Sequence, residues 1–233
     1  WIMKRLLVDL SALYNTYSGL GQVALSYGRY FAKHYKADKA DYRLYLLLPK
    51  KYFGAFGSEI HYISSDNWWL RHCRYLFPKF DVWHSIDQLT RFKPSSATTK
   101  HIVTIHDLNY LYEEKDAKKR ATAQRRIQRT IKKAIQIVCI SDFTKREVER
   151  NFSLDGKLCR VIYNQVKQLD VSKAQKPDID IRAPFFFAIG VLVEKKNFHV
   201  LLDLMKLLPE KHLYIAGKDG YISGLPTPYA DMI

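Results

Sequence analysis

The chain has 233 residues, a length that suits one large domain or one domain and part of another. Hydrophobic residues make up 47 %, which is enough for a real core and excludes a wholly disordered chain. Lysine and arginine total 38 against 23 acidic residues, so the net charge is +15 and favours anionic partners such as nucleic acid, lipid headgroups or phosphorylated substrates.

The sequence gives few signs of membrane insertion or export. No stretch reaches the ~18 consecutive apolar residues that a membrane-spanning helix needs. Residues 1–7 contain Lys4 and Arg5 but neither a signal-type apolar core nor a cleavage site. An odd, scattered set of cysteines without metal-ligand spacing fits a reducing compartment and predicts no metal site: Cys73, Cys139 and Cys159. We therefore expect a cytoplasmic protein.

Apolar runs of strand length alternate with longer amphipathic stretches over the first two thirds of the chain. In chain order, strands are expected at 6–10, 42–48, 60–63, 81–86, 102–105, 136–140 and 160–163. Helices are expected at 21–35, 68–77, 116–134 and 142–151. This alternation predicts an α/β fold whose parallel sheet is covered on both faces.

A polar break at 165–184, with two prolines and little periodicity, has the composition of a linker. The alternation then resumes with a strand at 185–189, a helix at 197–208 and a strand at 212–216. We assign residues 1–166 to an N-terminal domain, 167–184 to a linker and 185–233 to the start of a second domain. The last range has 49 residues, fewer than the ~100 or more of a doubly wound domain, so we expect it to be incomplete.

The segment G-L-G-Q-V-A at 19–24 has the glycine spacing of a dinucleotide-binding turn. However, residues 11–18 separate it from the first strand, and the second strand is followed by prolyl and lysyl residues instead of an acid, which argues against a nicotinamide or flavin site. Gly19 and Gly21 still allow close backbone approach to a ligand beside the free N–H groups of a helix start. An ordinary loop-to-helix turn explains them equally well.

The strand at 102–105 runs directly into His106 and Asp107. Because open α/β sheets bind ligands beyond the carboxyl ends of their strands, His106 is a candidate for hydrogen bonding to an oxyanion or for proton transfer. The alternative is a plain helix start, with Asp107 as the N-cap and His106 merely nearby.

The second candidate site follows the strand at 185–189. Gly190 ends that strand, Lys195 and Lys196 follow in a short loop, and a helix is expected from Asn197. A lysine just ahead of a helix start is well placed to bind phosphate, because its charge and the helix dipole add. A solvated loop charge is the alternative.

The stretch 118–133 contains eight lysines and arginines and keeps its apolar residues on one side. This pattern predicts an amphipathic helix with a basic face, which is either simply solvated or docks on an anionic membrane.

The aromatic and basic segment 68–75 has two interpretations. The preferred one is that it packs one side of a helix into the core; the alternative is that it faces a lipid or sugar acceptor. Ser141 and Asp142 are expected to cap the helix that follows.

Taken in order, five features resemble the family 4 retaining glycosyltransferases, also called group 1. They are the glycine turn at 19–21, T-I-H-D-L at 104–108, I-S-D-F-T at 140–144, V-I-Y-N at 161–164, and Gly190 with the K-K-N run at 195–197 ahead of L-Y-I-A-G at 213–217. The resemblance implies a GT-B fold, in which two Rossmann-like domains face a cleft. The N-terminal domain takes the acceptor, and the C-terminal domain holds a nucleotide-diphosphate sugar as co-substrate, with no obligatory metal and no other cofactor.

The resemblance also implies roles for single residues. Lys196, together with Gly190 and Asn197, would bind the donor diphosphate; Gly19 and Gly21 would lie near the phosphates and the acceptor, and His106 beside the reacting sugar as the catalytic residue. Two departures stand out: Val191 replaces an arginine found in many members, and no two glutamates are eight positions apart, as the pair that binds the donor sugar and ribose is in the family. We therefore expect the chain by itself to be inactive.

The expected function is hexosyl transfer from a nucleotide-diphosphate sugar to a glycan or lipid-linked acceptor in polysaccharide biosynthesis, with retention and without a metal. The expected partners include an anionic membrane, to whose inner face the protein would bind peripherally. A basic nucleic-acid-binding α/β protein is an alternative suggested by charge, although no aromatic-basic signature supports it. Another GT-B enzyme, such as a sugar-nucleotide epimerase, and an inactive or regulatory fragment that binds only the acceptor are further alternatives.

Overall fold

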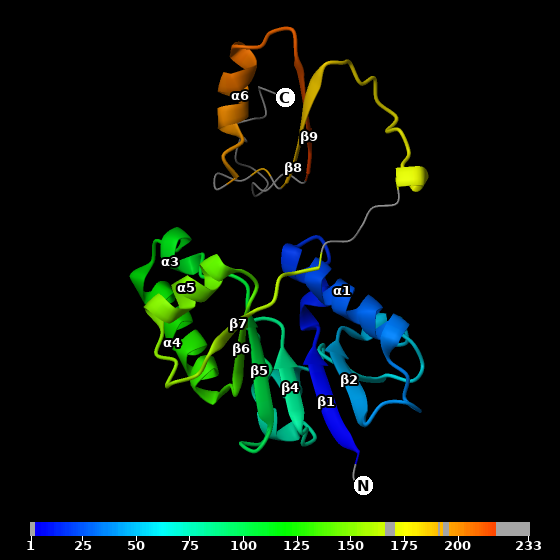
Figure 1. Cartoon of the computed structure of the whole chain (residues 1–233), viewed down its shortest axis with the longest axis vertical. Coiled ribbons are helices and arrows are strands. Elements are labelled where there is room, and N and C mark those ends of the chain that lie inside the picture. Colours follow the sequence, from blue (N-terminus) through cyan, green and yellow to red (C-terminus); the bar gives the residue numbers. More distant parts are fainter. Residues whose placement is uncertain (1–2, 166–170, 191, 193–195, 218–233) are drawn as a thin grey trace. The chain divides into compact units, whose positions relative to one another are not determined.

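A computed structural model describes residues 3–165, 171–190, 192 and 196–217 of the chain (Figure 1). The chain divides into two compact units, residues 1–167 and 168–233. The assignment of 167–184 to a linker stays a prediction.

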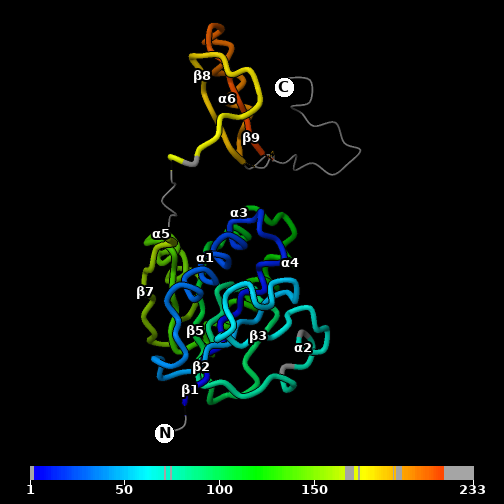
Figure 2. Tube along the Cα trace, turned by 90° about the vertical axis from the view of Figure 1, so that its right-hand side faces the viewer, coloured from blue at the N-terminus to red at the C-terminus, as the bar shows by residue number. Residues whose placement is uncertain are grey.

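The first unit is built on a parallel sheet. Among the described residues, seven strands pair in the order β3-β2-β1-β4-β5-β6-β7, and every neighbouring pair is parallel (Figures 1 and 2). The strands are β1 (Lys4–Asp9), β2 (Tyr42–Leu48), β3 (His61–Ser64), β4 (Val82–Ser85), β5 (Lys100–Ile105), β6 (Gln136–Cys139) and β7 (Cys159–Val161). The predicted α/β class with a parallel sheet is thus confirmed. The order reverses between β1 and β4, and sheets of this kind bind ligands at the carboxyl ends of the strands beside such a reversal.

Helices connect the strands of the first unit. They are α1 (Gly19–His34), α2 (Trp68–His72), α3 (Tyr110–Glu113), α4 (Ala117–Lys133) and α5 (Asp142–Asn151), with short 3-10 helices η1 (Ser11–Asn15), η2 (Lys50–Tyr52) and η3 (Arg74–Leu76). The second unit has η4 (Val171–Lys173), the parallel strands β8 (Phe185–Ile189) and β9 (His212–Ala216), and α6 (His199–Lys206) between these strands in sequence.

The two faces of the sheet carry different apolar clusters. Val8 pairs in register with His84, and His84 with Ile102, so these three side chains share one face. On that face, Val8 packs in a buried cluster with α1 and leucines of β2. Val103 points to the opposite face, where it packs with Ile127 of α4 and with α5. The apolar side of α4 that the sequence predicts is therefore the side buried on the sheet.

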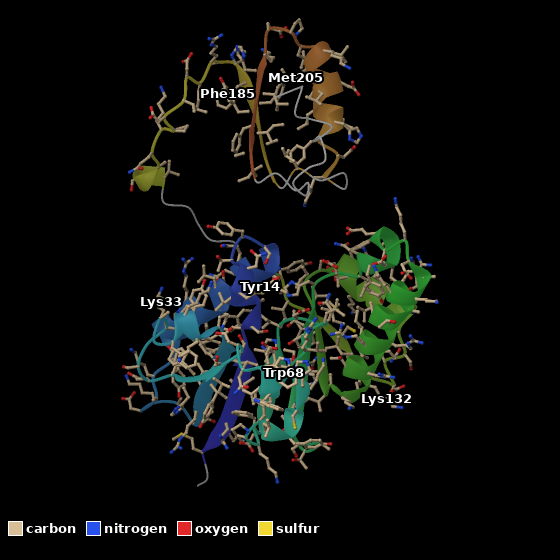
Figure 3. All side chains as sticks on the ribbon, turned by 180° about the vertical axis from the view of Figure 1, so that it is seen from behind. Tyr14, Lys33, Trp68, Lys132, Phe185 and Met205 are labelled. Atoms are coloured by element: carbon tan, nitrogen blue, oxygen red, sulfur yellow. The ribbon has the colours of Figure 1, made fainter. Side chains whose placement is uncertain are left out.

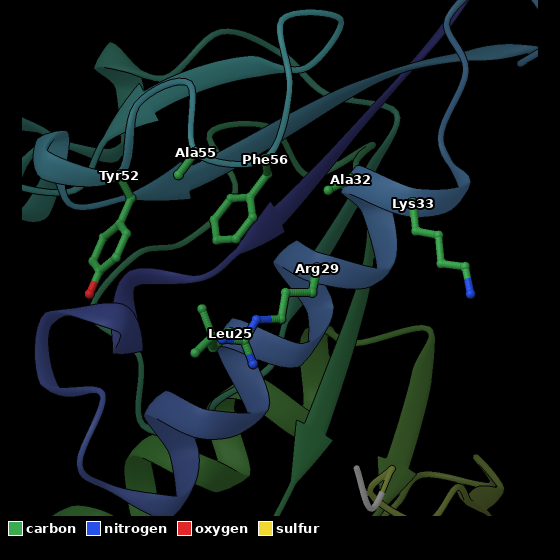
Figure 4. Close-up of a pocket in the computed structure, with 7 residues that line it drawn as sticks. All are labelled: Leu25, Arg29, Ala32, Lys33, Tyr52, Ala55 and Phe56. Carbon is green, nitrogen blue, oxygen red and sulfur yellow. The ribbon is translucent and has the colours of Figure 1, made fainter. Parts of the chain in front are cut away.

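A close contact joins α1 to the segment after β2. A Cβ atom at position 28 would lie only 2.4 Å from Cζ of Phe56, so Gly28 leaves the space for this ring and a larger residue would force the ring to move. Figure 4 shows Phe56 pointing toward α1, beside a pocket of about 490 Å³ that is also lined by Leu25, Arg29, Ala32, Lys33, Tyr52 and Ala55. No residue of the predicted sites lines this pocket, so we do not assign it to the candidate site.

The helix predicted at 68–77 is wrong in extent. α2 ends at His72 because Cys73 adopts an extended backbone, and η3 follows as a separate turn. Core packing also fails for Trp68 and Trp69, whose exposed fractions are 57 % and 64 %. Leu70 of α2 packs against a buried apolar cluster, and this contact anchors α2 to the domain.

Limited proteolysis tests the division into domains. Residues 174–180 are exposed and form neither helix nor strand, so thermolysin is expected to make its first cut in this region. The expected bond is the one on the N-terminal side of Ile179. Mass spectrometry of the earliest products should place their new ends within 165–184. First cuts inside 40–160 would contradict the domain boundary.

Candidate active site

The carboxyl ends of the central strands meet at one edge of the first unit, where there is a cavity of about 320 Å³. Its lining comes from the start of α1 and from the segments after β4, β5, β6 and β7: Gly19, Leu20, Val23, Asp87, Gln88, His106, Asp107, Ile140 and Asn164. The cavity thus brings together Gly19 and His106, which are 87 positions apart in the sequence. Gly21 lies close by in the chain but does not line the cavity.

Three hydrogen bonds hold His106 at the end of β5. Its Nε2 atom lies 2.8 Å from the carbonyl oxygen of Ile86, and its backbone N–H donates to Oε1 of Gln88 at 3.2 Å. Its carbonyl accepts from Oγ1 of Thr144, in the first turn of α5, at 3.0 Å. Two residues that follow β4 and one residue in the first turn of α5 therefore fix both the backbone and the ring of His106.

The contact with Ile86 also determines which ring nitrogen of His106 is available to a ligand. A carbonyl oxygen only accepts, so the proton of the neutral ring is assigned to Nε2 and Nδ1 becomes the acceptor. No described residue forms a hydrogen bond with Nδ1. This nitrogen can therefore accept a hydrogen bond or a proton from a bound hydroxyl, and in the imidazolium form it can donate to a developing negative charge.

Gln88 is a site residue that the sequence analysis missed. Its side chain is buried and both accepts and donates a hydrogen bond. Oε1 accepts from the N–H of His106, and Nε2 donates to the carbonyl of Asp107 at 3.0 Å. Gln88 thus clamps the turn that carries the histidine. The available signal was position, because Asp87 and Gln88 come directly after a predicted strand, at the edge where such sheets bind ligands.

Two carboxylates of the cavity mainly stabilise turns. Oδ1 of Asp107 accepts from the N–H of Asn109 at 3.1 Å, and Oδ1 of Asp87 accepts from the N–H of Leu89 at 2.7 Å. Asp107 is not the helix N-cap that the alternative interpretation expected, because α3 begins at Tyr110 and Asn109 takes the N-cap position; Asp107 instead holds a local turn. This contact does not exclude a role for His106, since both residues line the same cavity.

The structure separates the roles of Gly19 and Gly21. α1 begins at Gly19, two residues before the predicted start, and Oγ of Ser18 caps it by accepting from the N–H of Gly21 at 3.0 Å. A Cβ atom at Gly21 would lie 2.0 Å from the carbonyl oxygen of Asn15, whereas at Gly19 it would meet no atom within 4 Å. Gly21 is therefore needed because the turn packs backbone against it, whereas the space beside Gly19 is free for a ligand or a side chain. The N–H groups of Gly19 and Leu20 have no acceptor among the described residues, and such groups at a helix start bind anions.

A larger cavity of about 540 Å³ shares Val23, His106 and Asn164 with the first. Aromatic rings from α1 and from the segment after β7 line it together with hydroxyl and amide groups: Gln22, Ser26, Tyr27, Tyr30, Phe31, Thr104, Tyr163 and Gln165. Ile86, Val138 and Ile162 complete its wall. A mixed aromatic and polar lining of this size is typical of sites for organic ligands.

A second histidine, His84, supports the wall of the larger cavity. Its Nε2 atom lies 2.9 Å from Oγ1 of Thr104, and its ring meets the ring of Tyr27 edge-on. Burial, with a smaller contribution from the charge of His106, lowers the pKa of His84 to about 4. His84 is therefore uncharged at neutral pH, which suits a packing role better than proton transfer.

The remaining predicted site residues lie in the second unit. The N–H of Gly190 donates to the carbonyl of Ala216 at 2.9 Å, and Lys196 is exposed. Asn197 has a left-handed backbone with φ of 56°, so α6 begins at His199 and not, as predicted, at Asn197. Lys195 lies outside the described residues.

Two kinds of feature are absent from the described residues. No cluster of three or more histidines, cysteines, aspartates or glutamates in the described part of the chain has an arrangement that could hold a metal ion. Within the same part of the chain, no helix is both long and apolar enough to span a membrane.

The first unit is a Rossmann-like α/β domain with a candidate site at the carboxyl edge of its sheet. Residues 23–167 match the family model described as Glycosyltransferase Family 4. Because this match covers more than half of the sequence, the chain belongs to Glycosyltransferase Family 4, and its fold is of the GT-B, Rossmann-like kind.

Two similar proteins illustrate the relationship. The chain is 20 % identical over 166 residues to the O-antigen chain mannosyltransferase RfbU of Salmonella typhimurium, a match that covers 66 % of this chain and 45 % of RfbU. Its fold is similar to that of Anabaena Alr3699/HepE, solved in complex with UDP and glucose, with a TM-score of 0.54 and 16 % sequence identity over 91 % of this chain and 60 % of that one. The chain thus spans about half the length of RfbU.

The two glycines provide a matched pair of variants. Gly21→Ala is expected to lower the free energy of unfolding by roughly 1–3 kcal/mol or more, because its Cβ would collide with backbone atoms. Gly19→Ala should change it by less than about 1 kcal/mol, because its Cβ meets open space. Urea unfolding followed by circular dichroism measures both values. Equal losses of stability in the two variants would show that the glycines do not have separate roles.

Proposed function

We propose that the chain is part of an enzyme that transfers a hexosyl group from a nucleotide-diphosphate sugar to a glycan or lipid-linked acceptor. The observation that carries the proposal is the cavity in which the start of α1 and His106 meet, in a chain of Glycosyltransferase Family 4. The free N–H groups at the helix start can bind an anion, and the imidazole ring beside the cavity can donate or accept a hydrogen bond; both properties suit such a transfer.

The acceptor would bind in the larger cavity. Its aromatic side chains offer apolar surface, and Ser26, Thr104 and Gln165 offer hydrogen bonds to hydroxyl groups. Because His106 is shared by both cavities, an acceptor hydroxyl in one and a donor sugar in the other would both lie next to its ring. In this arrangement, Nδ1 of His106 would accept a hydrogen bond from a hydroxyl group of the sugar.

The donor diphosphate would bind Lys196, with Gly190 and Asn197 shaping the turn around it. The leaving diphosphate gains negative charge as the glycosidic bond opens, and a cation and free N–H groups lower the energy of that state. Lys196 would supply that cation, and the N–H groups of Gly19 and Leu20 are anion-binding donors within the first unit. Since this arrangement compensates the charge with protein groups, we propose transfer without a metal, and with retention as in the family that the motifs resemble.

Two similar proteins support the proposed classes of acceptor and donor. RfbU is named an O-antigen chain mannosyltransferase, which supports a role of this chain in polysaccharide biosynthesis. HepE was solved with UDP and glucose, which supports a nucleotide and a hexose as the two parts of the donor. A sugar-nucleotide epimerase would need no acceptor, so the dependence of product formation on an acceptor separates the two activities.

The test of the proposed function is the substitution of Lys196. In the enzyme that contains this chain, Lys196→Ala should lower the rate of transfer by roughly a hundredfold or more, because one electrostatic partner of the leaving group is lost. The side chain is exposed, so the loss of stability should be small. Release of nucleoside diphosphate from UDP- and GDP-hexoses, with and without acceptor, measures the rate. His106→Ala should also slow transfer, through the other unit.

Lys195→Ala is the matched control, since it removes the same charge one position away. Its turnover should stay near that of the wild type. An equal loss in both lysine variants, or wild-type turnover in the Lys196 variant, would rule out Lys196 as the diphosphate ligand. A product that forms without any acceptor would favour the epimerase.

We also propose a cytoplasmic location with peripheral binding to the anionic inner face of a membrane. The polar side of α4 supports this proposal, because it exposes cations along the helix and in its last turn, where Figure 3 labels Lys132. Lysine or arginine near an anionic surface contributes about 1 kcal/mol each, so several together suffice for binding.

Liposome flotation tests membrane binding. The protein should float with vesicles of phosphatidylcholine and phosphatidylglycerol, and it should stay at the bottom with phosphatidylcholine alone. Recovery with the anionic vesicles should fall as salt is raised, because mobile ions screen the attraction. Equal recovery with both kinds of vesicle would remove the proposal.

A further inference from the structure

A basic pocket of about 470 Å³ lies between α4 and the loop that precedes β5. We define the basic pocket by its charged and polar lining: Gln88, Lys93, Ser95, Ser96, Thr99, His101, Arg126, Arg129, Thr130 and Lys133. Pro94 and Ala97 complete it, and the lining contains no carboxylate. His101 is the second residue of β5 and His106 follows the end of this strand, so the two positions are about 16 Å apart along the strand. Gln88 is the residue that the basic pocket shares with the candidate active site.

Four permanent or near-permanent cations converge on this pocket: Lys93, Arg126, Arg129 and Lys133. None of them takes part in an ion pair with a described carboxylate. Burial lowers the pKa of Lys93, with the nearby Asp9 acting in the opposite direction, so the fold holds this ammonium group in a place that disfavours its charge. Concentrated positive charge in a pocket whose lining contains no carboxylate favours the binding of an anionic ligand.

Part of this charge is held in place by hydrogen bonds. Nζ of Lys93 donates to Oγ1 of Thr130 at 3.1 Å, and Nη2 of Arg126 donates to the carbonyl of Leu89 at 2.8 Å. Both bonds leave further N–H groups of the two cations for a ligand. Arg129, on the same side of α4, has no hydrogen bond to a described residue.

His101 contributes no charge to the pocket. Burial, together with the charges of Lys93 and Lys133, lowers its pKa to about 3, so the ring is neutral at physiological pH. Its Nε2 atom lies 3.0 Å from Oγ of Ser85. The pocket therefore combines fixed cations with neutral hydrogen-bonding groups, which is the chemistry that recognises phosphate.

We propose that the basic pocket binds a phosphate group, carried either by a soluble phosphate ester or by a phospholipid headgroup. The volume has room for a phosphate and a small polar group attached to it. The simpler interpretation of α4 is a solvated basic face, on which every cation attracts anions equally. The two differ in a measurable way, because only some of the cations of α4 line the pocket: Arg125 and Lys132 do not. The proposal does not depend on the proposed transfer reaction.

The experiment uses the whole chain and inorganic phosphate as the probe, with binding measured by isothermal titration at constant ionic strength. Arg129→Gln is the first variant, because this exposed side chain has no hydrogen bond to a described residue and its loss should not disturb folding. Lys132→Gln is the matched control, since it removes one charge from the same helix outside the pocket. Arg129→Gln should weaken phosphate binding at least about tenfold, and Lys132→Gln by less than about twofold.

Two further variants test whether phosphate binds in the basic pocket and not at the site of Lys196. Lys93→Met keeps the length of the side chain, and it should also weaken binding at least about tenfold if its circular dichroism spectrum matches that of the wild type. Lys196→Ala should retain the phosphate affinity of the basic pocket, because Lys196 belongs to the other candidate site. Loss of binding in Lys196→Ala alone would overturn the phosphate pocket without touching the proposed transfer function.

Vesicles identify the carrier of the phosphate. If the ligand is a lipid headgroup, Arg129→Gln should lower flotation with phosphatidylcholine vesicles that contain phosphatidic acid more than Lys132→Gln does, because Lys132 contributes only the general attraction of the basic face. If flotation is equal in both variants while inorganic phosphate binding differs, the carrier is a soluble ester. Equal weakening of phosphate binding by Arg129→Gln and Lys132→Gln, or wild-type affinity in both pocket variants, would overturn the proposal.

Discussion

The parallel pairing of the strands is the constraint on which the rest of the structure depends. Because every strand from β3 to β7 runs in the same direction, all of their carboxyl ends reach the same edge. Residues from distant parts of the sequence, Gly19, Gln88, His106 and Asn164, are thereby placed around one cavity. The ring of His106 can reach the carbonyl of Ile86 because β4 and β5 are paired neighbours in the sheet.

Much of the fold could be predicted because its elements are set by local patterns. The predicted bounds agree with the structure for β2, α5, β8 and β9, where apolar runs or capping residues mark both ends clearly. The helix at 68–77 failed because its aromatic residues resemble a core-facing side, whereas tertiary packing uses Leu70 and leaves Trp68 and Trp69 exposed. The late start of α6 depends on the left-handed backbone of Asn197, which no periodicity reveals.

The candidate site was predictable in part, from a residue that stands at the end of a strand and from a glycine pattern. Such a position identified His106, and the glycine spacing identified the turn at α1. The sequence could not distinguish the space around Gly19 from the backbone contact at Gly21, since that difference arises from the distance to Asn15. Gln88 was missed for a similar reason, because its two hydrogen bonds join segments that become neighbours only in the folded sheet.

The contact between Gly28 and Phe56 has a consequence for how this domain can vary among relatives. A side chain at position 28 and a large ring at position 56 compete for the same space, so the two positions cannot enlarge together. Relatives that carry alanine or a larger residue at the first position should carry a smaller residue than phenylalanine at the second. The pair should therefore appear as coupled substitutions, and its state should report how closely the segment after β2 approaches α1 in each relative.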